Sequence, residues 1–321
     1  MITDATGRIF KKLRISLTHE CNYACVYCVD NSIKSGDSKN ITPSILKPLL
    51  TSSDIISIVK RLHTNLNLNA IRLTGGEPLL HPRINTIISD IKEMGIANIG
   101  MTTNGHLLSA KAQSLYDSGL ESVNISLDAL NPETFVSMSL HNGLSTVLKA
   151  IDAALSASLK VKINTVVVSG KNDQEIVPLL EYAINKNIII RFLELMPMGP
   201  LHKNRKEMFF SKDQILANIQ AKYSIEALSD EPGSTADYWN INGKKAFGII
   251  ANDSSPFCSD CNRLRLDSYG NIYGCLSSLI PISINKEIPE PNLNSALQLA
   301  LSHKQTTHFM GNDRTMQSIG G

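Results

Sequence analysis

Six cysteines, gathered in two groups, are the residues of this sequence best suited to chemistry. The first group has the spacing Cys-x3-Cys-x2-Cys and consists of Cys21, Cys25 and Cys28. The second has the spacing Cys-x2-Cys-x13-Cys and consists of Cys258, Cys261 and Cys275. In an intracellular protein of this size, two tight groups indicate metal or redox chemistry more often than a disulfide framework.

Each group offers three thiolates, one fewer than the number of irons in a 4Fe-4S cluster. The iron without a protein ligand could then bind a small molecule. A structural zinc site with a fourth ligand such as His19 is the alternative for the first group, and an incomplete zinc ribbon for the second. We favour two iron-sulfur clusters, because no fourth cysteine or nearby histidine completes the second group.

Short β-branched segments alternate with segments of helical periodicity over the first 200 residues. We expect strands at 13–17, 71–74, 98–102, 123–127, 161–167 and 188–193, and helices that include 84–94, 110–118, 144–157 and 174–185. This alternation indicates a parallel sheet with right-handed crossovers. Several strands end in polar turns, where such folds place their sites. Six units make an incomplete barrel with one open side.

From about residue 200 the sequence consists of shorter segments rich in Pro and Gly. Asn242-Gly243, between Tyr238-Trp239 and Ala246-Phe247, predicts a β-hairpin. We therefore expect an α/β fold in which residues 1–200 form a partial (β/α)6 TIM-like barrel. Residues 201–321 would close its open side and carry the second cysteine group.

The composition is that of a compact globular protein of 321 residues, with 42% hydrophobic and 19% charged residues. A net charge of +2 gives no general reason to bind nucleic acid or membrane, so any anion site must be local. No apolar run approaches the ~20 residues of a spanning helix, and the first residues lack a signal-peptide pattern. We expect a cytoplasmic protein.

Two sets of motifs resemble a known family. The first cysteine group, with Tyr27 inside it and Gly75-Gly76-Glu77-Pro78 after the second expected strand, resembles the radical S-adenosylmethionine (SAM) superfamily. Cys258-x2-Cys261-Asn262-Arg263-Leu264-Arg265, Cys275 and the terminal Gly320-Gly321 resemble the MoaA family, the GTP 3′,8-cyclases of molybdenum cofactor biosynthesis. The segments 29–36 and 276–281, which follow the two cysteine groups, depart from that family's usual sequence.

The resemblance implies two 4Fe-4S clusters, each held by one cysteine group, in a partial (β/α)6 barrel. The first cluster would bind SAM, whose contacts would be Tyr27, Gly76, Ser126 and Met196. The second would bind GTP, whose contacts would be Arg14, Arg72, Thr102, Lys162, Arg263, Leu264 and Arg265. The catalytic machinery would include Arg263, Arg265, Gly320 and Gly321. Gly75 and Gly76 would let the backbone approach the SAM amino group.

The activity implied is a lyase-type cyclisation of GTP. A 5′-deoxyadenosyl radical derived from SAM would remove hydrogen from the ribose 3′ carbon, and the substrate radical would attack carbon-8 of guanine. The product, 3′,8-cyclo-7,8-dihydro-GTP, would pass to a MoaC-type synthase in molybdopterin synthesis. The resemblance also implies a reductant protein and a possible homodimer.

Arginines support a triphosphate substrate, because guanidinium groups bind phosphate bidentately. Arg14 and Arg72 lie on one face of the first two strands, and Arg263 and Arg265 follow the second cysteine pair, so the four could converge. Ion pairs inside the barrel are the alternative explanation for each arginine. Two rival functions remain: a radical SAM enzyme with an auxiliary cluster that acts on a peptide, and a zinc-stabilised binding module.

Overall fold

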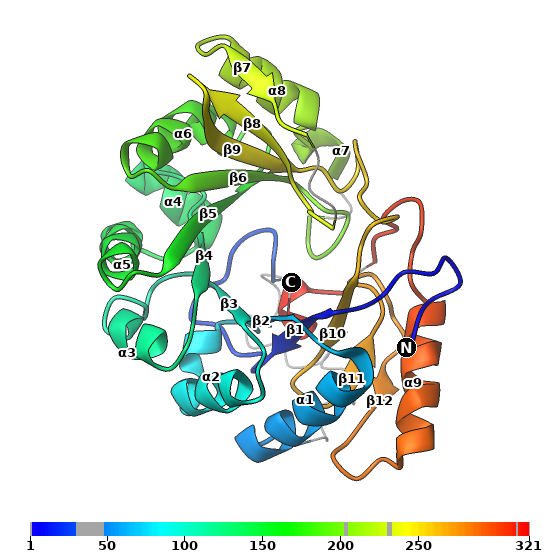
Figure 1. Cartoon of the computed structure of the whole chain (residues 1–321). Coiled ribbons are helices and arrows are strands. Elements are labelled where there is room, and N and C mark those ends of the chain that lie inside the picture. The colour runs from blue at the N-terminus through cyan, green and yellow to red at the C-terminus, as the bar shows by residue number, and fades with distance from the viewer. Residues whose placement is uncertain (1, 30–47, 202–204, 230–232, 313, 321) are drawn as a thin grey trace, which may run out of the picture.

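The structure, a computed structural model, describes residues 2–29, 48–201, 205–229, 233–312 and 314–320. Most of the divergent segment 29–36 therefore lies outside the described residues. The described residues contain a single continuous sheet in the order β12-β11-β10-β1-β2-β3-β4-β5-β6-β9-β8-β7. It curves into an arc with the helices on its outer side (Figure 1).

The six expected strands are all present, and they lie side by side in chain order and parallel. They are β1 (Lys12–Ser16), β2 (Ala70–Thr74), β3 (Asn98–Thr103), β4 (Ser122–Ser126), β5 (Lys160–Val167) and β6 (Ile189–Glu194). The helices between them are α1 (Ser52–Leu66), α2 (Ile84–Glu93), α3 (Ala112–Asp117), α4 (Pro132–Ser139), α5 (Leu144–Ser156) and α6 (Ile176–Asn185). The predicted α/β fold with a partial barrel is confirmed.

The C-terminal region adds strands to both ends of this arc. Its elements are α7 (Arg205–Met208), α8 (Lys212–Gln220), β7 (Ile225–Ala227), β8 (Asp237–Ile241), β9 (Lys244–Ile250), β10 (Arg263–Leu266), β11 (Asn271–Tyr273), β12 (Ile282–Ser283) and α9 (Glu290–Ser302). β9 pairs with β6 and β10 pairs with β1, both in parallel. The C-terminal segment lies inside the arc (Figure 1). The division of the chain at residue 200 stays a prediction.

The predicted hairpin joins β8 and β9 through Asn242 and Gly243. Both residues have positive φ, +52° and +73°, as the two central positions of a type I′ turn require. Gly tolerates this conformation without cost, and Asn is among the residues that adopt it most readily.

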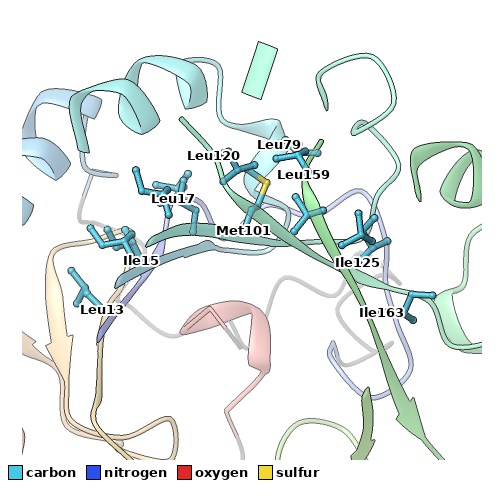
Figure 2. Packing of buried hydrophobic residues seen from close by; sticks show 14 of the residues in the cluster. Leu13, Ile15, Leu17, Leu79, Met101, Leu120, Ile125, Leu159 and Ile163 are labelled. Carbon is cyan, nitrogen blue, oxygen red and sulfur yellow. The ribbon is translucent and has the colours of Figure 1, made fainter. Parts of the chain in front are cut away.

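The hydrophobic core lies between the sheet and the outer helices. Figure 2 shows side chains from this layer, including Leu13 and Ile15 of β1, Ile125 of β4 and Ile163 of β5. Because strand side chains alternate, the residues between these core positions face the inside of the arc. Alternation therefore directs Arg14 and its counterparts on neighbouring strands inward. No helix of the described residues is both long and apolar enough to cross a bilayer.

Candidate active site

One cavity of about 270 Å³ lies inside the arc, and all six cysteines line it. The first group follows the carboxyl end of β1, whereas Cys258 and Cys261 precede β10, which runs parallel to β1, so the second group lies toward the opposite end of the strands. Their thiols are free of disulfides. Eight other predicted site residues also line this cavity: Arg14, Tyr27, Gly76, Thr102, Ser126, Met196, Arg263 and Arg265. The structure thus brings both cysteine groups, far apart in sequence, to the two sides of one space.

The first cysteine loop follows β1 and is held by the turn after β2. The Gly76 amide donates to the Thr18 carbonyl and the Glu77 amide donates to the Glu20 carbonyl, each at 2.7 Å. A Cβ atom on Gly76 would overlap the Glu20 carbonyl oxygen. Glycine is therefore needed at position 76 because the turn and the cysteine loop pack backbone against backbone. This reason differs from the expected one, namely that glycine leaves space for the SAM amino group.

Glu77 joins the ends of β2 and β3. Its buried carboxylate accepts hydrogen bonds from the Thr103 hydroxyl (2.7 Å), the Asn104 amide (2.8 Å) and the Leu79 amide (3.0 Å). Burial raises the pKa of Glu77 to about 7, although these donors act in the other direction. The Asn104 side chain lies 3.8 Å from the Cys21 sulfur, so this network reaches the first cysteine group.

Tyr27 is fixed by a carboxylate that the sequence analysis did not select. The Tyr27 hydroxyl donates to Asp128 Oδ2 at 2.7 Å, and Asp128 Oδ1 accepts from the Val166 amide at 2.9 Å. Burial raises the pKa of Asp128 to about 6. The polar turn after the fourth strand was the signal that could have identified this residue.

The second cysteine group lies beside a buried lysine. Lys304 Nζ lies 3.2 Å from the Cys261 sulfur and donates to the carbonyls of Arg263 (2.7 Å) and Gly274 (2.8 Å). Burial raises the pKa of Cys261, but Arg263 and Lys304 outweigh it and bring the pKa to about 6. Burial raises the pKa of Cys258 to about 11. Lys304 was missed, because no sequence motif marks it.

Arginines form the most unusual electrostatic feature of the cavity. In the strand register Arg14 lies opposite Arg72 on one side and Arg265 on the other. None of these three, nor Arg191 or Arg263, belongs to any ion pair found among the described residues. Burial lowers the pKa of Arg72 and Arg265 to about 10, and burial and the neighbouring arginines lower that of Arg14. Arg263 lies 3.4 Å from the Cys261 sulfur, whereas the other buried guanidinium groups face no carboxylate among the described residues and so favour a bound anion.

Arg191 also lines the cavity, although it was not predicted. It lies on β6, and its Nε and Nη2 atoms donate to Asn164 Oδ1 at 3.0 and 2.7 Å. Like Arg14, Arg191 stands between apolar neighbours in a central strand, so the sequence carried a signal for this residue.

Three predicted substrate contacts lie away from the cavity lining. Arg72 donates to the Met101 carbonyl (3.2 Å), and the Lys162 ammonium lies 5.7 Å from the centre of the Tyr238 ring. Leu264 is fully buried in the hydrophobic core, on the other face of β10 from its arginine neighbours.

The tail reaches the inside of the barrel. The Gly320 carbonyl accepts a hydrogen bond from Arg265 Nη1 at 2.6 Å. Gly320 has φ +70°, and a Cβ there would crowd Ser16 and Thr74, which end β1 and β2. Gly321 lies outside the described residues.

Each cysteine group offers three thiols to a metal centre. Within the described ranges, no three Cys, His, Asp or Glu side chains converge tightly enough to hold a single metal ion. A 4Fe-4S cluster binds its thiolates through different irons, so its ligands are spaced more widely than those of one zinc ion. Three free thiols on each side of the cavity have the chemistry that such a cluster requires.

Two family models match the chain. The Radical SAM superfamily model matches residues 15–183, and the Molybdenum Cofactor Synthesis C model matches residues 188–310. The first range holds the first cysteine group, and the second range holds the other.

Curated relatives agree with these models. A GTP 3′,8-cyclase of Staphylococcus carnosus is 41% identical over 283 residues, which cover 87% of this chain and 82% of the relative. GTP 3′,8-cyclases of Staphylococcus saprophyticus and Staphylococcus aureus are 39% and 38% identical, with the same coverage.

Solved structures with similar folds are much more distant in sequence. SuiB of Streptococcus suis bound to the precursor peptide SuiA has a TM-score of 0.64 at 14% identity, covering 98% of this chain and 70% of SuiB. The enzyme anSMEcpe with bound AdoMet and the Cp18Cys peptide has a TM-score of 0.61 at 15% identity, covering 91% and 80%. These likenesses concern the fold alone. From its relatives and both family models, the chain belongs to the radical SAM superfamily and, within it, to the GTP 3′,8-cyclase family.

Proposed function

We propose that this chain converts GTP to 3′,8-cyclo-7,8-dihydro-GTP in the first step of molybdenum cofactor biosynthesis. One observation carries the proposal: the cavity that both cysteine groups line is also lined by Arg14, Arg191 and Arg265, which pair with no carboxylate among the described residues. A triphosphate supplies the missing negative charge. The relatives named GTP 3′,8-cyclase supply the reaction.

The first cysteine group would hold the 4Fe-4S cluster that membership of the radical SAM superfamily implies. That cluster, with SAM, supplies the 5′-deoxyadenosyl radical chemistry. Around it, Tyr27, Gly76, Ser126 and Met196 would bind SAM, and Asp128 would fix the Tyr27 ring through the 2.7 Å hydrogen bond. The protein's contribution here is orientation and exclusion of water.

The second cysteine group would hold a second 4Fe-4S cluster, also with three protein ligands. Arg14, Arg263 and Arg265 would bind the GTP triphosphate from the cavity wall, with Thr102 beside them. Arg72, Lys162 and Leu264 do not line the cavity and would act by supporting the residues that do. Gly320 and Gly321 would complete the site, because Arg265 already binds the Gly320 carbonyl.

Peptide modification is the nearest rival, since SuiB and anSMEcpe were solved with peptides. Their sequence identity of 14 to 15% carries the fold only. A neutral peptide backbone would also leave the buried guanidinium groups unpaired, which is costly. The zinc-stabilised module, the other rival, is tested by metal content.

The proposal extends to partners. A reductant protein would deliver electrons to the first cluster, and a MoaC-type synthase would take the product. We further propose a homodimer in the cytoplasm, with neither nucleic acid nor membrane as a partner, in keeping with the net charge of +2.

The decisive experiment measures 5′-deoxyadenosine by mass spectrometry. Anaerobically reconstituted, reduced protein is incubated with SAM and with each nucleoside triphosphate in turn. GTP-dependent formation, with a product isomeric with GTP, is the expected result. If 5′-deoxyadenosine formed at the same rate with every nucleotide and without any, the radical SAM chemistry would be supported and GTP as the substrate would be refuted. Arg263→Ala should weaken GTP binding and leave SAM binding unchanged, and equal loss of both would refute separate sites.

A further inference from the structure

An N-terminal hook, residues 3–9, contacts the second cysteine group although the two are distant in sequence. Thr3 and Ile9 form an isolated β-bridge, and Gly7, with φ +79°, donates its amide to the Asp4 carbonyl at 3.0 Å. These contacts close the hook on itself. One long side chain, Arg8, extends from it to the cysteines.

Asp4 fixes the orientation of the Arg8 guanidinium. Arg8 Nε and Nη2 lie 2.7 and 2.6 Å from Asp4 Oδ2, and the Arg8 amide donates to Asp4 Oδ1 at 3.0 Å. The two side chains are only 10% and 4% exposed. Two N–H groups of the guanidinium thus share one carboxylate oxygen, which fixes the plane of the guanidinium and leaves its other N–H groups directed elsewhere.

Those remaining N–H groups bind main-chain carbonyls of two separate segments. Nη1 donates to the carbonyl of Cys258, 250 residues away, and to that of Ser259 at 3.4 Å. Both Nη1 and Nη2 lie 3.4 Å from the Gln305 carbonyl. Arg8 therefore joins the loop of Cys258 to the segment that follows α9.

The segment after α9 contacts the other two cysteines of the group. Gln305 Oε1 lies 3.8 Å from the Cys275 sulfur, and Lys304 Nζ lies 3.2 Å from the Cys261 sulfur. Through one guanidinium, the hook is thus connected to all three thiols.

We infer that Arg8 is the positioning residue that keeps the second cysteine group assembled, so that this group can hold a cluster. The inference rests on the proposed second cluster. Arg8 does not line the cavity, so it acts through the cysteine loop and the segment after α9.

Arg8→Gln tests the inference, with Arg61→Gln as a matched control. Arg61 has the same chemistry on the outer layer: it donates to the carbonyls of Asn285 (3.4 Å) and Lys286 (3.2 Å) and pairs with Glu290 at 3.0 Å. Both variants lose a guanidinium that binds one carboxylate and several carbonyls. Only one of them touches the cysteine group.

Two quantities are measured on anaerobically prepared protein. The first is iron and sulfide per chain, which in Arg8→Gln should fall from about eight of each to about four, with the first cluster's spectroscopic signal kept. The second is the rate at which iodoacetamide modifies Cys258 relative to Cys25 in metal-free protein. Cys258 is 8% exposed, and its relative rate should rise ~10-fold or more when the loop loses a charged hydrogen bond. Arg61→Gln should change neither quantity.

Equal iron content and equal alkylation in the two variants would overturn the inference. Should Arg8→Gln not fold, Arg8→Lys replaces it: the lysine keeps the charge beside Asp4 and loses the planar fork, so the same selective loss is expected. Wild-type protein with only about four irons would refute the second cluster instead. In that case the alkylation rates alone decide whether Arg8 holds the cysteine loop.

Discussion

Replacing Arg265 with methionine should make the metal-free protein more stable and a poorer GTP binder. Arg265 is 9% exposed, and burial lowers its pKa from 12.5 to about 10. At pH 7 the Arg265 guanidinium is charged in both the folded and the unfolded chain, so the full difference between its unfolded and folded pKa values opposes folding. This penalty becomes smaller only as the pH rises above about 10. At about 1.36 kcal/mol per pKa unit, this penalty amounts to roughly 3 kcal/mol.

The substitution also removes a favourable contact. The hydrogen bond from Arg265 to the Gly320 carbonyl, 2.6 Å long, contributes ~1.5–3 kcal/mol as a charged donor. The free energy of unfolding should therefore rise by a net ~1 kcal/mol. GTP affinity should fall ~10- to 150-fold, since one phosphate-binding guanidinium is lost.

Urea unfolding of metal-free protein measures the first quantity, and equilibrium dialysis of reconstituted protein with GTP measures the second. Arg61→Met is the control: its guanidinium pairs with Glu290 and several carbonyls, so the variant should lose stability and bind GTP normally. If Arg265→Met were destabilised like the control, or bound GTP as tightly as the wild type, the idea of an uncompensated anion-binding cation would be wrong.

Three further predictions concern the cysteine loops and their supports. Asp128→Asn should flatten the pH dependence of stability. Burial raises the pKa of Asp128 from 3.8 to about 6, so the wild type loses up to ~3 kcal/mol of unfolding free energy as the pH rises from about 4 to above 6. Urea unfolding at pH 4 and at pH 7.5 measures this loss in both proteins. Gly76→Ala should destabilise the fold by ~1–3 kcal/mol, because its methyl group overlaps the Glu20 carbonyl; a midpoint of unfolding equal to the wild type would contradict the packing argument. Cys258→Ala and Cys25→Ala should each retain about four irons per chain. Electron paramagnetic resonance should show the first cluster in Cys258→Ala and the second cluster in Cys25→Ala. Zinc alone in either variant would exclude iron-sulfur chemistry.

Residues whose positions depend on strand periodicity could be predicted from the sequence. Alternation along the first strand correctly directs Arg14 into the barrel, and the same rule explains why Arg191 lines the cavity. The Asn242-Gly243 turn is specified by two adjacent residues, so the hairpin was predictable from local sequence alone. Periodicity also indicates that Leu264, between two inward arginines, faces the core.

Residues whose roles depend on contacts between distant segments could not be predicted. An inward-facing residue need not line the cavity: Arg72 shares a face with Arg14, yet its guanidinium binds the Met101 carbonyl and is not part of the cavity lining. Lys304 and Arg8 reach the second cysteine group through contacts between segments that no local pattern connects. Such positions follow from tertiary packing, which overrides local preference.

The pairing of β1 with β10 also sets an order of events during synthesis. β1 lies beside the first cysteine loop, and its outer edge stays unpaired until β10 has been made, about 250 residues later. At ~5–20 residues per second, that interval is roughly 12 to 50 seconds. During it the nascent chain presents an open strand edge, a feature prone to unwanted pairing, and three thiols that have no opposite wall. The wall that carries the second cysteine group is thus made long after the first three cysteines.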